Sequence, residues 1–476
     1  MNTRKLYLQV IVLLIALLAP GLCSAQIQTI LVGPDGQYAT VLEALAEVLT
    51  APQTLNVIKV QAGVNSNENL YFPPSWTSGT ISISGSWDAP FNNQSFDPAD
   101  TVISGGQTHR VIDIKIAGGT VILSSLSIVD GAHLVGAGIY ATPTNDAAVH
   151  LVNLAVHDNV ADSAGDASGA GIYSSLQDTS TLQIKDCDVY ANTATGGGKQ
   201  RGGGIYVGSS GGSAFSIIDT AIHNNDAFST VDLYGAGIYL GMGGTSIGTV
   251  TGCVVDGNTG SSLSTPIAVN GVGLSAWMTE ISQLSIERTR VVSNGMSPGW
   301  DHHQARIRGS GDSVVRITDS IVADGRSDGL ALLAEDQSVI HATNLTVAVN
   351  DRDGIYCDRN GASTAVINLS NSVVSANGVS DLNIASGPVT QTANIIGIDP
   401  EFVDMQDLDF RVEIGSVAED AGVIAPTGGL GVADIRGGLR VLGAAPDAGA
   451  YEGNVAMLFS DGFELRGALR WSETMY

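Results

Sequence analysis

A pentapeptide recurs along this chain at a fixed interval of 33 residues. It reads Gly-Ala-Gly-Ile-Tyr from Gly136, Gly169 and Gly235, and Gly-Gly-Gly-Ile-Tyr from Gly202. A fixed period of this size is typical of stacked copies of one supersecondary unit. We therefore expect a solenoid, in which equivalent positions of successive repeats form columns along the axis.

The residues between these markers alternate between apolar and polar, as in Thr181–Lys185. A period of two predicts strands, and the segments are short, rich in Val, Ile and Thr, and separated by Gly, Asn and Asp. Helical repeats of the same length require a period of 3.6 residues, which is absent here. The prediction is an all-β, single-stranded parallel β-helix with about three short strands in each coil.

Three columns follow from this register. The first is an inward aliphatic ladder, and the second is a corner column of asparagines whose amides can hydrogen-bond from coil to coil. The third is an outward strip of tyrosines about 4.8 Å apart, which is either a platform for sugar rings or a stacked ladder that shields the sheet. The members are Ile139, Ile172, Ile205 and Ile238; Asn159, Asn192, Asn225 and Asn258; and Tyr140, Tyr173, Tyr206 and Tyr239.

Both ends of the chain carry other signals. Residues 1–25 read as a secretory signal peptide, with two basic residues, an apolar run and a small-residue cleavage site. The Thr40–Glu43 segment is a capping box before an apolar helical stripe, so residues 26–100 are expected to hold a capping helix and the first coils. The repeats then occupy residues 101–395.

The segment after the repeats carries an ordered set of motifs. They are Asp399–Asp404, Asp409–Val412, Asp434–Gly437 and Pro446–Glu452. This order resembles the choice-of-anchor Q domain, and the coils around Gly202–Tyr206 are similar to those of the same family. The resemblance covers about residues 120–453.

The resemblance implies a right-handed, pectin-lyase-like β-helix with a C-terminal capping or anchor module over 396–453. Residues 454–476 are similar to a short tail of secreted proteins from Gram-negative bacteria. Together these features predict a protein that is secreted or held at the outer cell surface. No segment after the signal peptide is apolar and long enough to span a membrane.

The formal net charge of −26 limits the partners. Such an acidic chain disfavours nucleic acids and anionic glycans, because both are themselves negatively charged. We expect a monomer whose partner is a polysaccharide or a cell-surface molecule. The segments 160–168, 193–201 and 226–234 are expected to be variable loops stacked on one side, where such a partner could bind.

Chemistry is predicted in the later coils, where the repeat shortens to 25 residues between Gly325 and Asn350. This register places Asp328 beside Asp353 in adjacent coils. With Asp351 they form a group of carboxylates of the kind that binds Ca²⁺, although the sequence implies no cofactor with certainty.

Three further residues complete the predicted site. His303 and Arg306 are candidates for a base or a charge stabiliser, and Trp300 for a contact with a sugar. Two functions therefore stay open. The first is a non-catalytic extracellular β-helix that is adhesin-like or binds glycans. The alternative is a polysaccharide lyase or glycoside hydrolase with Asp328, Asp353, Arg306 and His303 as its catalytic residues. The first is favoured because the sequence holds no complete catalytic set.

Overall fold

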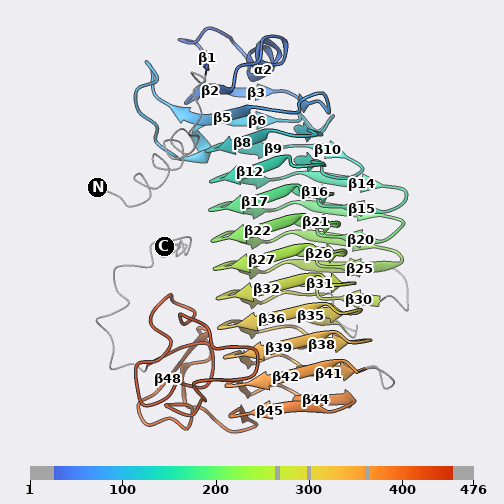
Figure 1. Ribbon diagram of the computed structural model, residues 1–476, viewed down its shortest axis with the longest axis vertical. Coiled ribbons are helices and arrows are strands. Elements are labelled where there is room, and N and C mark those ends of the chain that lie inside the picture. Colours follow the sequence, from blue (N-terminus) through green and yellow to red (C-terminus); the bar gives the residue numbers. More distant parts are fainter. Residues whose placement is uncertain (1–25, 263–267, 297–301, 360–363, 454–476) are drawn as a thin grey trace.

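The chain winds into a right-handed parallel β-helix, as the repeat predicts (Figure 1). The structure is a computed structural model and describes residues 26–262, 268–296, 302–359 and 364–453. Each coil contributes one strand to each of three long parallel sheets, called A, B and C here. Within the described residues these sheets have 13, 12 and 11 strands, respectively.

Sheet A has the strands β1 (Ile27–Val32), β2 (Leu55–Gln61), β5 (Thr80–Trp87), β8 (Thr120–Ser124), β12 (Ala148–Val152), β17 (Thr181–Lys185), β22 (Ala214–Ile218), β27 (Ile247–Thr251), β32 (Gln283–Glu287), β36 (Val314–Thr318), β39 (Val339–Thr343), β42 (Val366–Ser370) and β45 (Val389–Thr392). Sheet B has β3 (Asn65–Asn67), β6 (Val102–Ser104), β9 (Ser127–Val129), β13 (Ala155–His157), β18 (Asp188–Tyr190), β23 (Ala221–His223), β28 (Val254–Asp256), β33 (Arg290–Val292), β37 (Ile321–Ala323), β40 (Thr346–Ala348), β43 (Val373–Ser375) and β46 (Ile395–Ile396).

Sheet C has β4 (Leu70–Phe72), β7 (Ile112–Ile114), β11 (Ile139–Ala141), β16 (Ile172–Leu176), β21 (Ile205–Ser209), β26 (Ile238–Met242), β31 (Leu274–Met278), β35 (His303–Gly309), β38 (Asp328–Ala334), β41 (Asp353–Arg359) and β44 (Ser380–Ser386). A short 3-10 helix, η1 (Pro98–Asp100), precedes β6.

The core is a stack of aliphatic side chains inside the coil. The inward ladder is confirmed, because Ile139 pairs with Ile172, and Ile205 with Ile238, and all four are fully buried. Apolar side chains from sheets A and B meet them in the same continuous cluster. Burial of these aliphatic columns is the main contribution to stability in so thin a fold.

Two corner columns explain the polar repeats. The asparagine column is buried, and each amide hydrogen-bonds to the next, as in Asn192 Nδ2 to Asn225 Oδ1 at 2.9 Å. At a second corner, between sheets A and B, successive coils place one residue in the left-handed region, such as Asp186 with φ 53° and Asp219 with φ 48°. Asp, Asn and Gly tolerate this conformation best, which accounts for their recurrence there.

In one coil, the glycine and the amide side chain of this asparagine column have exchanged positions. In the neighbouring coils the asparagine faces a glycine of sheet C, and a Cβ on Gly273 would lie 2.6 Å from Asn294 Nδ2. In the next coil Gly325 replaces the asparagine, and Gln304 of sheet C replaces the glycine. Gln304 Oε1 accepts the backbone N–H of Asn294 at 2.9 Å, and Gln304 Nε2 donates to Asn350 Oδ1 at 3.2 Å. The column therefore continues through a side chain from the opposite wall.

The segments predicted as loops are instead strands, so that prediction is wrong. They form a ribbon of two small parallel sheets, D and E, which projects from one side of the coil (Figure 1). Their strands are β10 (Ala132–His133), β14 (Val160–Ser163), β19 (Thr193–Gly196), β24 (Asp226–Ser229), β29 (Thr259–Ser262) and β34 (Gly295–Met296) in sheet D, and β15 (Ala167–Ser168), β20 (Gln200–Arg201), β25 (Asp232–Tyr234) and β30 (Ala268–Asn270) in sheet E.

Charges along the ribbon are complementary from coil to coil. Arg201 Nη1 lies 3.3 Å from Asp166 Oδ2 of one neighbouring coil, and Lys199 Nζ lies 3.3 Å from Asp232 Oδ2 of the other. The differences in charge between these segments therefore reflect pairing within the ribbon. The ribbon ends at β30 and β34, where the repeat shortens.

The N-terminal end is covered by the predicted helix α2 (Val41–Thr50). The Thr40 side chain accepts from the backbone N–H of Glu43, and the Glu43 side chain accepts from that of Thr40, so the predicted capping box is present. The buried face of α2, which includes Val41 and Leu45, closes the apolar core at this end.

The C-terminal module contains the antiparallel strands β47 (Phe402–Asp404) and β48 (Asp409–Val412) and little other regular structure. It lies beside the coil and not across its end (Figure 1). Phe410 packs against Ile321 and Ala348 on the outer side of sheet B. The described residues include no helix of the length and hydropathy needed to cross a bilayer.

Candidate functional site

The outward face of sheet C carries the predicted tyrosine strip. Tyr140, Tyr173, Tyr206 and Tyr239 are in register in successive coils. Consecutive rings stack with centroids 5.0, 4.6 and 5.4 Å apart and interplanar angles of 5°, 1° and 17°. The Arg110 guanidinium lies 4.2 Å from the Tyr140 ring and covers the first of them.

This stacking decides what the tyrosines can do. A sugar packs on an aromatic face, but each inner ring has both faces against other rings. Burial also raises the pKa of Tyr239 to about 12, so its hydroxyl stays protonated at neutral pH. The strip itself therefore offers ring edges and hydroxyl groups to a ligand, and its stacking shields the sheet.

The tyrosine column ends where the ribbon ends. Below Tyr239 the same column continues with Ser275, Arg306, Ala331 and Tyr356. Ser275 and Ala331 are small and buried, so no large side chain of this column stands beside Arg306 in either neighbouring coil. Strand β30 of the ribbon lies beside β35 at this level.

Trp277 and Arg308 stand beside Arg306 in the adjacent outward column. The Trp277 ring is 37% exposed, and the Arg308 guanidinium lies 4.6 Å from its centroid. Arg308 Nη2 also binds Glu335 Oε2 at 2.8 Å, which fixes its position. The next residue of this column toward the N-terminal end is Gly241, so no side chain of that position stands against the other face of Trp277. We call Trp277, Arg306 and Arg308 the arginine–tryptophan patch.

Arg306 is the unusual member of this patch. It is half-buried, and burial followed by repulsion from Arg308 lowers the pKa of its guanidinium. Among the described residues, no side chain forms a hydrogen bond or an ion pair with that guanidinium. A partly desolvated charge without a direct counter-ion is costly, and an anionic or polar ligand group would reduce that cost.

The predicted acidic residues lie together at the edge of sheet C. Asp328 is in register with His303 in one neighbouring coil, and the alignment of Leu330 with Ile355 places it beside Asp353 in the other. His303 Nδ1 approaches Asp328 Oδ2 to 3.2 Å, without the direction of a hydrogen bond.

One oxygen of each carboxylate in this group accepts a hydrogen bond within the fold, whereas Asp353 Oδ1 is buried without a hydrogen-bond partner among the described residues. Asp328 Oδ1 accepts the backbone N–H of Asp353 at 3.2 Å and lies 3.7 Å from Arg352 Nε. Asp353 Oδ2 accepts from Asn383 Nδ2 at 2.6 Å. Asp328 and Asp353 are only 6% and 5% exposed, so a polymer in solvent has little access to them.

The remaining predicted site residues are not all gathered here. Arg306 lies three residues along β35 from His303 and belongs to the arginine–tryptophan patch. Tyr356 lies closer, with its ring centroid 5.7 Å from that of His303, and burial followed by the charges of Asp358, Asp328 and Asp353 raises its pKa. Trp300 lies outside the described residues.

The predicted calcium ligands were Asp328, Asp351 and Asp353. Asp351 is exposed at the corner before β41. Within the described ranges, no group of three His, Cys, Asp or Glu side chains is placed to hold a metal ion.

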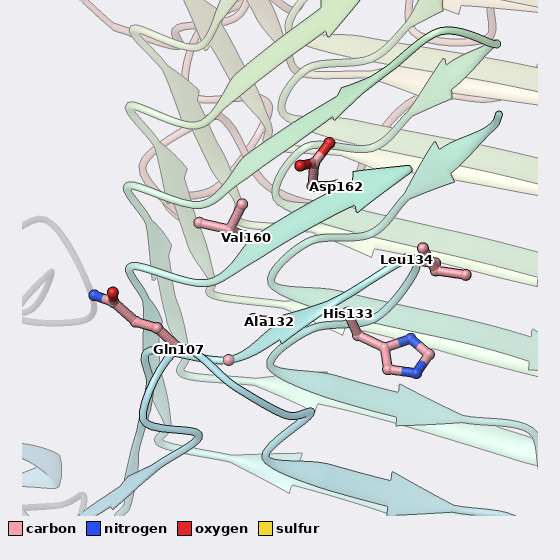
Figure 2. A pocket seen from close by; sticks show the side chains of 7 residues that line it. Gln107, Ala132, His133, Leu134, Val160 and Asp162 are labelled. Atoms are coloured by element: carbon pink, nitrogen blue, oxygen red, sulfur yellow. The ribbon is translucent and has the colours of Figure 1, made fainter. Parts of the chain in front are cut away.

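A separate open pocket of about 590 Å³ lies at the beginning of the ribbon (Figure 2). Leu134 and Val160 are exposed at this pocket, and Gln107 and Asp162 add polar groups. His133 also lines it, and its Nδ1 lies 2.9 Å from Arg110 Nη2. Burial and the charge of Arg110 lower the pKa of this histidine. None of the predicted site residues lines this pocket.

Sequence reasoning missed Trp277 and Gln304. A signal for Trp277 exists, because it follows Ser275 by two residues in a coil where the tyrosine column is interrupted. In a strand, a spacing of two places residues on the same face.

No protein family model matches the chain, and neither does the sequence of any curated protein. Among solved structures, the crystal structure of pectate lyase Pel9A is similar, with a TM-score of 0.46 and 11% sequence identity over 90% of this chain and 97% of that chain. Similarity at this level does not identify an activity, so the chain's own residues must carry the functional argument.

Proposed function

We propose that this protein is a non-catalytic, glycan-binding β-helix that acts outside the cell. The observation that carries the proposal is the arginine–tryptophan patch on the outward face of sheet C. Trp277 offers an exposed aromatic surface, and Arg306 offers a guanidinium to which no side chain in the described part of the chain is hydrogen-bonded or ion-paired. An aromatic ring beside fixed hydrogen-bond donors suits a sugar, which is apolar on its ring faces and polar at its edges.

The position of the patch favours an extended ligand. Outward side chains of sheet C form columns along the axis, and the ribbon borders this face as far as β30. A polysaccharide lying along the axis would meet Trp277 and Arg306 where that border ends. The net charge of −26 repels dense polyanions, so we propose a chain whose acidic groups are widely spaced.

The buried state of Asp328 and Asp353 supports a non-catalytic role over a lyase or hydrolase. General acid–base catalysis needs a carboxylate within reach of the substrate proton, and these carboxylates are buried, with one oxygen of each bonded to the protein. The incubation of a polysaccharide panel with the protein, with and without Ca²⁺, tests the alternative. Unsaturated or reducing-end products that disappear in Asp353→Ala would establish the enzymatic reading.

Binding is tested by affinity electrophoresis and calorimetry on neutral, sparsely acidic and densely acidic polysaccharides. We expect binding to the sparsely acidic class, with a loss of at least tenfold in Trp277→Ala and in Arg306→Ala. Trp87→Ala is the matched control, because Lys59 lies 3.7 Å over the Trp87 ring at the other end of the molecule. Equal losses in the Trp87 and Trp277 variants would refute the site.

The location outside the cell is part of the proposal and is supported by sequence alone. Residues 1–25 lie outside the described residues, as does the tail after Gly453. Expression of the full chain in a Gram-negative host, followed by fractionation and N-terminal sequencing, tests it. A mature N-terminus at Gln26 in the extracellular or outer-membrane fraction is the expected result, and an uncleaved cytoplasmic product would contradict it.

A further inference from the structure

The two ends of the β-helix differ in how the core is closed. At the N-terminal end, α2 covers the core, and Leu45 and Val48 are fully buried under it. At the C-terminal end the last coil consists of β44, β45 and β46, and these are the final strands of sheets C, A and B (Figure 1). Within the described residues, nothing pairs with their free edges.

The inward side chains of this last coil are incompletely covered. Ile384 continues the inward column of Cys357, which is fully buried, yet Ile384 is 41% exposed. Gln391 is exposed although it stands below the fully buried Leu369 in sheet A. The core of the solenoid therefore meets solvent at this end.

Of the features that normally protect free strand edges, the last coil has a register shift in β44 opposite Cys357 and Asp358, but it has no lysine. Exposed edges usually carry lysines, other charges or bulges that prevent pairing with another chain. From Ser380 to Ile398 the only charged residue is Asp381, and its Oδ1 accepts from Asn377 Nδ2 at 2.8 Å as the last member of the asparagine column. This segment thus carries a single charge in a chain with a net charge of −26.

We propose that two copies of this protein associate through the C-terminal ends of their β-helices, with their last coils facing each other. Charge favours a second copy here, because elsewhere the two acidic surfaces repel each other, whereas these ends carry almost no charge. A two-fold axis perpendicular to the coil axis would place the free edge of β45 antiparallel to that of the partner's β45, and it would set β44 of each copy opposite β46 of the other. A head-to-tail filament is excluded because α2 covers the other end.

The proposal replaces the sequence-based expectation of a monomer and is independent of the glycan-binding proposal. The purified protein is examined by sedimentation velocity and small-angle X-ray scattering. We expect twice the monomer mass and a maximum dimension close to twice the length of one β-helix. A monomer at all concentrations, or a dimer with the maximum dimension of one β-helix, would overturn this end-to-end arrangement.

Point variants locate the contact. Ile384→Lys places a like charge in both facing ends, and Thr390→Lys does so at an exposed position on β45 outside the core. Each should return the protein to monomer mass where the wild type is dimeric, with an unchanged circular dichroism spectrum. Ile281→Lys is the matched control, because Ile281 is 51% exposed on the side of the coil. A dimer that persists in both end variants, or that is lost in Ile281→Lys, would refute the contact.

Discussion

Gln304 is expected to be the most sensitive polar residue of the coil interior. It is 1% exposed and makes four hydrogen bonds, which join Asn294, Ala323 and Asn350. At about 1 kcal/mol net for each bond, Gln304→Gly should lower the free energy of unfolding by about 4 kcal/mol. The loss of a side chain from a strand adds up to about 1 kcal/mol. The buried backbone N–H of Asn294 would also lose its acceptor.

Because Gln304 and Gly325 have exchanged the usual positions of glycine and asparagine, a second substitution at Gly325 should restore the stability lost in Gln304→Gly. A Cβ on Gly325 would lie 3.0 Å from Gln304 Nε2, so Gly325→Asn alone should overpack the interior and destabilise by about 1–3 kcal/mol. The double variant recreates the glycine–asparagine pair of the neighbouring coils. We expect it to lie within about 1–2 kcal/mol of the wild type, a coupling of at least 3 kcal/mol between two sites that are each harmful when changed alone.

The assay is urea unfolding followed by circular dichroism, together with hydrogen exchange at the amides of β33 and β35. Exchange is needed because a solenoid can open locally around one weakened coil while both ends remain folded. A cost below 1 kcal/mol for Gln304→Gly would show that the polar column contributes little. Additive effects in the double variant would show that Gln304 and Gly325 do not substitute for the usual pair.

Three further outcomes follow from the fold. Burial raises the pKa of Asp319 to about 6 and that of Glu452 to about 7. Asp319 lies at a corner of the coil, 3.4 Å from Arg440 of the C-terminal module. The folded protein therefore binds more protons than the unfolded chain between about pH 4 and 7, so its stability should fall as pH rises through this range in calorimetric scans, and less steeply in Asp319→Asn. Ile205→Ala leaves a cavity in the inward ladder and should cost about 2–5 kcal/mol in urea unfolding, whereas a cost near zero would contradict the packing. At Asp186, with φ 53°, Ala should be about 1 kcal/mol less stable than Gly in the same assay, and the reverse order would contradict the left-handed corner.

The regular part of this fold could be predicted from the sequence because, in a repeat, the spacing between residues determines which of them stack in the structure. Once Ile172 and Tyr173 were assigned to inward and outward columns, the same assignment held in successive coils, since parallel strands stack in register. The capping helix was readable for a local reason, because a capping box depends on residues only three apart.

The parts that were missed depend on contacts between columns. A glutamine at position 304 is accommodated because Gly325, in another column of the same coil, leaves room for its side chain. A comparison of residues within one column does not reveal this relation. The ribbon was taken for loops because its strands are two to four residues long and show no clear alternation. For the acidic group, register placed Asp328 beside Asp353, but it did not show that Asn383 and Arg352 occupy their oxygens.

The charge pairing along the ribbon sets the length of the repeating unit in this part of the β-helix. Asp166 lies in an acidic segment of the ribbon, Lys199 and Arg201 in a basic segment, and Asp232 in an acidic segment again. Duplication of a single coil would place Lys199 against a second Lys199, and like charges opposite each other in a sheet are destabilising. Duplication of two successive coils preserves the alternation. In this segment the shortest repeat that preserves the charge pairing is therefore a pair of coils, twice the period visible in the sequence.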